Sequence, residues 1–387
     1  MCNIRQTAML ATVIFLLLTS VFFSSNVLEL PHMQYYTEKE TLAMLKTLVI
    51  PPPKHSPHPN RYAWTVWKGR QLPSQLPGPP ANNETPMLFC SVLKVDSWGN
   101  ISMVQPSQNP IVHLPVLEHF QQRVQLAVAE YGPLAGTFYF DFDSIDLPTC
   151  SARLPSTGRC ADIDQKEGEC CTSGRPLVGV ARNVCCPCSL PLPLHGNQMP
   201  AALQHYLNFT DPFAFDQKTA RAIWRGAPTG SAGHANFYTR YYNLTHHART
   251  TPRQTILRLS RRRPDLLSAS LDRVTMEEFF RYKYIVTVSG NSYAGILKQA
   301  LLSNSCVIRQ EPGASEWYEP LLEEWRHYIP VKYDLSDLLE KIQWAMHHDK
   351  ECYQMAQESR QFALKHFQSS AVNQFVHMAI RGEIPWG

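Results

Sequence analysis

Three carboxylates follow an aromatic, apolar segment in the first half of the chain. Asp141, Asp143 and Asp146 end the run Phe138–Pro148, which is typical of a buried strand that leads into a turn. A carboxylate at such a strand end can accept the proton of an attacking hydroxyl group. Asp141 and Asp143 also form a D-x-D pattern, and residues two apart in a strand face the same side. This pair could therefore hold a divalent metal ion, and acidic residues that only cap a turn have the same pattern.

A second group of residues suited to chemistry follows the apolar segment 220–225. Arg225 ends this segment, and Gly226, Thr229 and Gly230 come next. An arginine can hold phosphate oxygens with two hydrogen bonds at once, and glycines let the backbone approach a ligand closely. An exposed turn with an ordinary surface arginine is the alternative interpretation.

A third group lies between the apolar segment 284–288 and the helix expected over 294–302. Gly290, Asn291, Ser292 and Tyr293 form a turn of mostly small residues there. Backbone N–H groups at the start of a helix bind phosphate, and open α/β sheets bind nucleotides at such strand ends. An ordinary strand-to-helix connection has the same appearance.

Further charged residues could reach the same place. Arg253 and Lys298 are cations, and Glu316 stands beside Trp317 and Tyr318. A carboxylate can bind the hydroxyls of a ribose or sugar while an aromatic ring stacks on it. The alternative is an amphipathic helix over 317–325 whose Trp317 belongs to the core.

These residues need a scaffold, and the hydrophobic pattern predicts an α/β fold with a parallel sheet in the second half, where strands alternate with helices. The expected strands are 87–95, 136–142, 176–181, 220–225, 284–288, 306–309 and 327–331. The expected helices are 119–131, 276–282, 294–302, 317–325, 336–347 and 350–367, with Asp334 and Ser336 as cap candidates for the fifth.

The N-terminal segment predicts a membrane anchor. Residues 8–23 carry no charge and are rich in Leu, Val, Ile and Phe, with Arg5 before them and Glu29 after them. This pattern favours a type II signal-anchor over 1–28, although a cleaved signal peptide is the competing interpretation. The Pro-rich segment 29–85 is typical of a stem. Either way, the rest of the chain is expected in the lumen of the secretory pathway or outside the cell.

Cysteines and glycosylation sequons support that compartment. Sequons begin at Asn83, Asn100, Asn208 and Asn243. Besides Cys2 there are ten cysteines, and seven of them lie within 150–188. In an oxidising compartment this favours a disulfide-rich loop, and zinc is the less favoured alternative because a second well-spaced pair is missing.

Composition excludes other classes of protein. The 387 residues are 44% hydrophobic and 18% charged, with a net charge of +4, so two globular domains fit the length. The only dense basic cluster is Arg261–Arg263. This cluster fits a solvated helix end rather than a nucleic-acid surface.

Taken together, the motifs resemble the capsule-associated-protein family of glycosyltransferases, which includes protein O-glucosyltransferases and O-xylosyltransferases of the secretory pathway. The resemblance covers about 220–346 and includes Trp224-Arg225-Gly226, the block His327-Tyr-Ile-Pro-Val331 and Asp334-Leu-Ser. Upstream, Asp146-Leu-Pro148 resembles the short Asp-x-Pro motif of the family. Most of 31–135 shows no usable resemblance.

The resemblance implies a GT-B arrangement, with two Rossmann-like domains over 86–215 and 216–387 and a cleft between them. It implies an inverting, metal-independent transfer from a UDP-sugar, UDP-glucose or UDP-xylose, to a glycan or protein hydroxyl, with Asp146 as the base. It places the donor mainly in the C-terminal domain, on Arg225, Thr229, Arg253, Gly290, Asn291, Ser292, Tyr293, Lys298 and Glu316. Arg225, Thr229 and Arg253 would neutralise the leaving diphosphate.

One departure from the family pattern matters for activity. Many members carry an arginine on the helix after the glycine turn, where this chain has Ile296. Lys298 lies half a helical turn further on. A catalytically silent lumenal protein that binds a sugar or an acceptor is therefore the second hypothesis, and a metal-dependent transferase using Asp141 and Asp143 is the third.

Overall fold

The computed structural model describes residues 91–106, 114–142, 177–183, 189–230, 244 and 250–383. All of them fall in one compact unit, 50–387, so the expected domain boundary at 215/216 stays a prediction. The expected anchor (1–28), the stem (29–85) and most of the cysteine-rich loop (150–188) lie outside the described residues. None of the helices within the described ranges is long and apolar enough to cross a membrane.

The first sheet is mixed and has the strand order β2-β1-β3-β4-β6. Its strands are β1 (Ser91–Val95), β2 (Ile101–Gln105), β3 (Phe138–Phe142), β4 (Leu177–Gly179) and β6 (Ser189–Pro191). β1 pairs antiparallel with both β2 and β3, whereas β3, β4 and β6 run parallel. The expectation of a Rossmann-like N-terminal half is therefore met only in part, because β1, which lies between β2 and β3, runs antiparallel to both of them.

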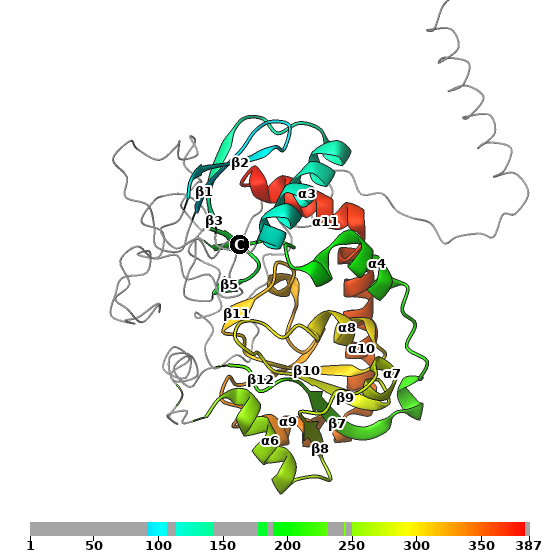
Figure 1. The fold of residues 1–387 in the computed structure, drawn as a ribbon. Coiled ribbons are helices and arrows are strands. Elements are labelled where there is room, and N and C mark those ends of the chain that lie inside the picture. The colour runs from blue at the N-terminus through cyan, green and yellow to red at the C-terminus, as the bar shows by residue number, and fades with distance from the viewer. Residues whose placement is uncertain are drawn as a thin grey trace, which may run out of the picture. The chain divides into compact units, whose positions relative to one another are not determined.

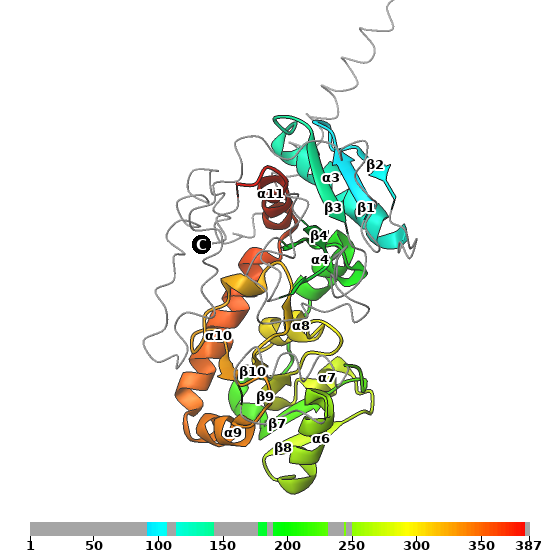
Figure 2. The ribbon, with the colours of Figure 1, turned by 90° about the vertical axis from the view of Figure 1, so that its left-hand side faces the viewer.

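Two helices from opposite ends of the described chain cover the first sheet. α3 (Leu114–Tyr131) and α11 (Ser369–Ile380) lie side by side in both views (Figures 1 and 2). Phe120 and Val124 of α3 pack in one core with Val376 and Ile380 of α11. The core of the first sheet thus depends on a helix that follows the second sheet.

The second sheet is fully parallel and has the order β12-β10-β9-β7-β8. Its strands are β7 (Thr219–Arg225), β8 (Leu267–Ser270), β9 (Tyr282–Thr287), β10 (Cys306–Gln310) and β12 (Ile329–Val331). The helices of this half are α6 (Pro252–Arg262), α7 (Met276–Phe279), α8 (Leu297–Leu302), α9 (Leu338–His347) and α10 (Asp349–His366). Numbered along the chain, this is the doubly wound order 2-1-3-4-5.

Helices cover both faces of the second sheet. Successive side chains of its strands point to opposite faces, and both sets are buried against helices. Trp224, Val286 and Ile308 pack in one core with residues of α6, α9 and the first half of α10. Ile223, Ile285 and Val307 pack in another core, with residues of α7, α8 and the end of α10. Apolar runs without a polar face, such as 284–288, are the sequence signature of such strands.

The remaining elements are short connections. They are β5 (Arg182–Asn183), η3 (Gly196–Gln198), α4 (Pro200–Leu207), η4 (Phe215–Gln217), β11 (Ala314–Ser315) and η5 (Glu319–Leu321). β5 and β11 form an antiparallel pair, Ala314 opposite Asn183 and Ser315 opposite Arg182. Backbone hydrogen bonds therefore join a segment after β4 to the segment just before Glu316.

Most of the expected elements are present, and the expected β9–α8–β10 unit is confirmed by the parallel pairing of β9 with β10. The expected helix over 317–325 is wrong, because only a short 3-10 turn, η5, forms there. Pro320 lacks an N–H group and disfavours helical backbone at the residue before it. Trp325 then adopts a left-handed conformation, with φ of 62°.

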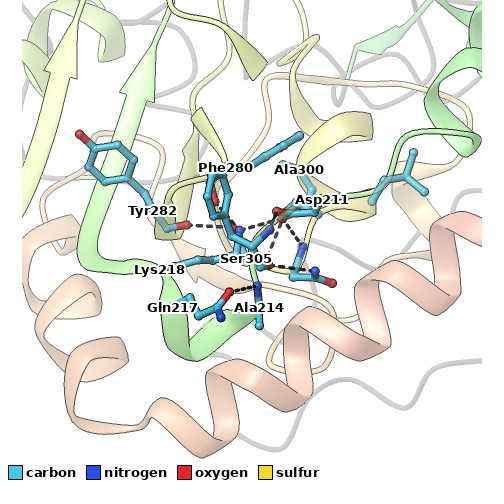
Figure 3. Close-up of polar contacts among 12 residues, drawn as sticks. Asp211, Ala214, Gln217, Lys218, Phe280, Tyr282, Ala300 and Ser305 are labelled. Carbon is cyan, nitrogen blue, oxygen red and sulfur yellow. Dashed lines mark hydrogen bonds and ion pairs between the residues drawn. The ribbon is translucent and has the colours of Figure 1, made fainter. Parts of the chain in front are cut away.

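A buried ion pair joins several chain segments at the amino edge of the second sheet (Figure 3). Lys218 Nζ lies 2.7 Å from Asp211 Oδ2, and both side chains are fully buried. Lys218 also donates to the carbonyl of Phe280, just before β9. Asp211 accepts the backbone N–H of Asn304, which precedes β10. One pair of charges therefore connects the starts of three neighbouring strands.

The described cysteines, Cys306 in β10 and Cys352 in α10, are buried free thiols. Neither belongs to the segment 150–188 for which disulfides are expected, so that expectation stays a prediction. Burial raises the pKa of the Cys306 thiol well above its usual value, so the thiol stays protonated and unreactive. The cysteines of the 150–188 loop lie outside the described residues.

Candidate functional site at the carboxyl edge of the parallel sheet

The order of the second sheet places a topological switch point between β7 and β9. The chain leaves β7 for β8 on one side of it, and the later strands β9, β10 and β12 lie on the other side. The loops that follow β7 and β9 therefore lead to α6 on one face of the sheet and to α8 on the other face. Open α/β sheets bind ligands at the carboxyl ends of such strands. Seven of the predicted site residues lie in or beside these loops: Arg225, Thr229, Arg253, Gly290, Asn291, Ser292 and Tyr293.

Arg253 holds the two loops together. It stands in the first turn of α6, which Thr251 caps by accepting the N–H of Gln254. Its guanidinium donates to the carbonyl of Ala227 (2.8 Å) and to Thr229 Oγ1 (2.7 Å) after β7. It also donates to the carbonyls of Val288 and Ser289 after β9, both at 3.2 Å. These four bonds use four of its five N–H groups.

The charge of Arg253 lies in a partly buried place. Burial lowers the pKa of its guanidinium from the usual value, but an arginine is far too basic to lose its proton near neutrality. The guanidinium also lies 5.9 Å from the centre of the Trp224 ring. The switch point therefore carries a fixed positive charge whose position is set by carbonyl groups of both loops.

Gly290 and Gly230 allow the two loops to touch. A Cβ atom on Gly290 would lie 2.6 Å from Thr229 Oγ1 and 2.8 Å from Arg253 Nη2. Gly230 has a φ of +106°, and its N–H donates to Asn291 Oδ1 at 2.9 Å. Only glycine fits the first position without a shift of its neighbours, and the second favours glycine because of its left-handed backbone.

The turn after β9 also contains an unsatisfied polar group. Ser292 is 7% exposed, and its Oγ atom is buried with no hydrogen-bond partner among the described residues. Buried hydroxyl groups are nearly always paired, so an orphan in a small-residue turn is what a ligand-binding turn would show. Tyr293 follows, and its ring meets His195 edge-on at 6.4 Å.

Arg225 lies on the other side of β7. Its Nη1 donates to the carbonyl of Ser268 in β8 at 2.7 Å, and its Nη2 donates to Ser268 Oγ at 3.1 Å. Its buried Nε has no partner in the described part of the chain. The structure therefore brings Thr229, Arg253, Gly290 and Asn291 into one cluster and places the Arg225 guanidinium beside β8.

Lys298 and Glu316 are bound to each other. Lys298 Nζ lies 2.5 Å from Glu316 Oε1 and 2.8 Å from Oε2, and both side chains are fully buried. Gln198 Nε2 and the Tyr318 hydroxyl donate to the same carboxylate, the latter at 2.9 Å. In this arrangement the charges of the two side chains neutralise each other, and neither side chain is exposed to a ligand in solvent. Sequence reasoning missed Gln198, which no motif marks.

The first half contributes less to the described site. Asp146, the predicted base, and Asp143 lie outside the described residues. Asp141 lies in β3, opposite Val92 of β1 and Leu177 of β4, and is 5% exposed. With strands on both sides and little exposed surface, Asp141 belongs to the interior of the first sheet. Its part in a metal-binding D-x-D pattern stays a prediction, because its partner is not described.

The family match to known proteins lies mainly in the second half of the chain. The model of the family described as Glycosyl transferase family 90 matches residues 184–381. Protein O-glucosyltransferase 2 of Danio rerio is 40% identical over 104 residues, which cover 27% of this chain and 21% of the relative. Protein O-glucosyltransferase 3 of Homo sapiens is 41% identical over 86 residues, which cover 22% of this chain and 17% of the relative.

A viral protein and a solved structure are also similar. Uncharacterized protein 035R of Invertebrate iridescent virus 3 is 30% identical over 196 residues, 43% of this chain and 17% of the relative. The chain thus spans between 17% and 21% of the length of these relatives. The crystal structure of Anabaena Alr3699/HepE in complex with UDP-glucose is 10% identical and covers 54% of this chain and 72% of that chain. Its TM-score of 0.28 is too low to support an argument.

Proposed function

This chain belongs to glycosyl transferase family 90, and from that premise we propose that it moves glucose or xylose from a UDP-sugar to a hydroxyl acceptor. The observation that carries the donor class is the cluster at the switch point of the parallel sheet. There Arg253 places a fixed positive charge next to Thr229 and Gly290, and the turn that begins at Gly290 carries the orphan hydroxyl of Ser292. A cation, a hydroxyl and the backbone N–H groups of a strand-to-helix turn are groups that commonly bind a diphosphate.

The proposed reaction is a single displacement with inversion. Asp146 would remove the proton of the acceptor hydroxyl, and the oxygen would attack the anomeric carbon as the bond to UDP breaks. Negative charge then develops on the leaving diphosphate. Arg253, and Arg225 if its side chain turns from Ser268, would stabilise that charge, while Gly290 and Asn291 would supply backbone N–H groups. No metal ion is needed in this scheme.

The relatives and the N-terminal sequence support the proposed acceptor and compartment. Two relatives are named as protein O-glucosyltransferases, so a protein hydroxyl is the proposed acceptor, and a glycan hydroxyl is the alternative. The expected signal-anchor and the sequons support a place in the lumen of the endoplasmic reticulum or Golgi. The chain would be held there as a single-pass type II membrane protein.

One observation favours the second candidate, a catalytically silent binding protein. Ile296, where many family members carry an arginine, is half-buried and packs against the core formed by α7, α8 and α10. Lys298 does not supply the missing cation, because it is paired with Glu316. The positive charge at the site then rests on Arg253 and Arg225 alone among the predicted donor residues.

A panel of UDP-sugars distinguishes the two candidates. UDP release is measured for the lumenal part of the chain, with EDTA present and with a serine-containing protein acceptor. We expect turnover of UDP-glucose or UDP-xylose, loss of turnover in Asp146→Asn, and unchanged UDP binding by that variant. Retained transfer in Asp146→Asn would rule out the proposed base. UDP binding without turnover of any donor, even with manganese, would favour the silent protein.

A further inference from the structure

The Lys298–Glu316 pair stands out because two fully buried charges occur next to the proposed donor turn. Every polar group of the pair has a partner: Lys298 Nζ contacts both carboxylate oxygens, Gln198 donates to Oε1, and Tyr318 donates to Oε2. Burying two charges is costly, and apolar residues of the same volume stabilise a core as well or better. Stability alone therefore does not explain the pair.

The surroundings of the carboxylate fix its position. The backbone N–H of Glu316 donates to Glu319 Oε1 at 2.8 Å, and Glu319 is itself paired with Arg309 Nη2 at 2.5 Å. The pairing of β11 with β5 holds the residue before it, Ser315. Glu316 is thus held from the backbone and the side chain, so it can act as a fixed anchor for Lys298.

Lys298 in turn lies near Tyr293, the last residue of the proposed donor turn. Its Nζ is 5.5 Å from the centre of the Tyr293 ring, within the range of a cation–π contact. Tyr293 also packs against the core of the first sheet and meets the ring of His195. The residue that ends the Gly290–Tyr293 turn is therefore held between Lys298 and the segment that follows β6.

Gln198 extends the same contacts toward the first sheet. It belongs to η3, and besides binding Glu316 it accepts, through its carbonyl, a hydrogen bond from the buried Arg123 of α3. A continuous set of buried contacts runs from Arg123 through Gln198 and Glu316 to Lys298. It joins the half of the chain that precedes the proposed acceptor base to the turn proposed for the donor.

We propose that Lys298 and Glu316 are positioning residues, which act through Tyr293 to set the geometry of the Gly290–Tyr293 turn for the donor diphosphate, with Gln198 linking that turn to the first sheet. This inference rests on the proposed function. It assigns Lys298 and Glu316 to support of the turn and leaves the direct contacts with the donor to the turn and to Arg253.

The test uses double variants, because a single change would leave one charge buried and unpaired. In Lys298→Met/Glu316→Gln the pair becomes neutral at similar volume. The matched control is Lys218→Met/Asp211→Asn, which neutralises an equally buried pair at the opposite edge of the same sheet. Both are compared with the wild type below their unfolding temperatures, in UDP affinity by calorimetry and in amide hydrogen exchange.

We expect Lys298→Met/Glu316→Gln to weaken UDP binding about tenfold or more and to speed exchange in peptides that contain 289–293. The control should keep UDP affinity within about twofold and change exchange only near 211–218. Lys298→Arg, which keeps the charge, should recover part of the affinity. Unchanged exchange at 289–293, or equal loss of affinity in both double variants, would overturn the inference. A wild type that binds no UDP would instead overturn the proposed function, and the exchange measurement would still decide the inference.

Discussion

At the scale of single residues, Gly290 is a glycine at which an added Cβ atom would meet its neighbours too closely. A Cβ atom there would meet Thr229 Oγ1 and Arg253 Nη2 at 2.6 and 2.8 Å. Both neighbours are held by hydrogen bonds, so neither can move without breaking contacts between the loops after β7 and β9. The glycine is thus required by packing rather than by an unusual φ angle.

We expect Gly290→Ala to lose about 1–3 kcal/mol of stability and to weaken UDP binding at least tenfold, because the loops must separate. Gly295→Ala is the matched control, since a Cβ atom at Gly295 would meet nothing within 4 Å. Urea unfolding and UDP calorimetry on both variants measure the two effects. Equal UDP affinities in Gly290→Ala and the wild type would contradict the close packing of the loops.

His327 is a second residue with a defined effect, this time on pH dependence. It is 4% exposed, and its Nδ1 accepts the N–H of Glu323 at 2.9 Å. Burial, opposed in part by Glu323, lowers the pKa of His327 from 6.5 to about 4. The unfolded chain therefore binds a proton between these two values that the folded chain does not bind.

The folded state consequently loses stability as the pH falls from about 6.5 to about 4, by about 3 kcal/mol from this residue alone. His327→Asn keeps an acceptor near the Glu323 N–H and cannot be protonated. We expect the free energy of unfolding of this variant to depend less on pH across that window, although it starts lower. Parallel curves for the variant and the wild type would show that His327 is not the group that titrates.

At the scale of elements, the Lys218–Asp211 pair fixes the entry of the chain into the second sheet. Asp211 accepts from Lys218, from the N–H of Asn304 and from the N–H of Phe213. Because these partners come from segments far apart in the sequence, the pair sets the register at which β7 and β10 begin. It lies at the opposite edge from the proposed donor site, so it bears on stability and not on binding.

Asp211→Asn leaves the Lys218 charge buried without a counterion, and we expect a loss of about 3–5 kcal/mol. Asp265→Asn is the control, because the Arg263–Asp265 pair is 40% and 58% exposed and such pairs contribute little. Urea unfolding of both variants gives the comparison. A loss below 1 kcal/mol in Asp211→Asn would mean that the amino edge is not held by this pair.

Elements were more predictable from the sequence than their contacts. β9 and β10 are marked by apolar runs, and α9 and α10 by the periodicity of their apolar residues, so all four elements could be expected. The alternation of strands with helices also predicts that β9 and β10 pair in parallel. The helix over 317–325 was wrong because apolar residues at helical spacing there fill the core around a turn set by Pro320. The motifs also marked Thr229, Arg253, Gly290 and Asn291, which the structure brings together.

The pairing of Lys298 with Glu316 could not be predicted. Both residues look available for a ligand in the sequence, and only the fold brings an amide from η3 and a hydroxyl from Tyr318 to the same carboxylate. Propensity and spacing describe neighbours along the chain. They carry no information about which charges satisfy each other in a core built from distant segments.

At the scale of the whole molecule, α11 connects the two halves. It follows α10 of the second half, yet its Val376, Ala379 and Ile380 lie in the core of the first sheet. Polar contacts reinforce the packing on α3, since Asn373 donates to Glu130 at 2.8 Å and His377 Nε2 contacts the carbonyl of Gly132 at 3.0 Å. The hydrophobic core of the first sheet is therefore incomplete without this helix.

A chain that stops after residue 368 tests this dependence. We expect rapid amide exchange in β1 and β3 of the truncated chain, because their core loses Val376, Ala379 and Ile380, and largely retained protection in β9 and β10, whose cores lose only Val372 among their buried residues. Hydrogen exchange followed by mass spectrometry reads both regions in one experiment. Equal protection of β1 and β3 in the truncated and intact chains would show that α3 alone closes the first core.

The place of α11 in the first core has a consequence for biosynthesis. A ribosome that has made β3 must add about 230 more residues before it reaches α11. At ~5–20 residues per second this takes about 10–45 s, during which the emerging first half has no complete hydrophobic interior. In this state, the nascent first half would depend on chaperones for longer than the second half, which is made later and can close its own sheet almost as soon as α10 and the first turn of α11 have emerged.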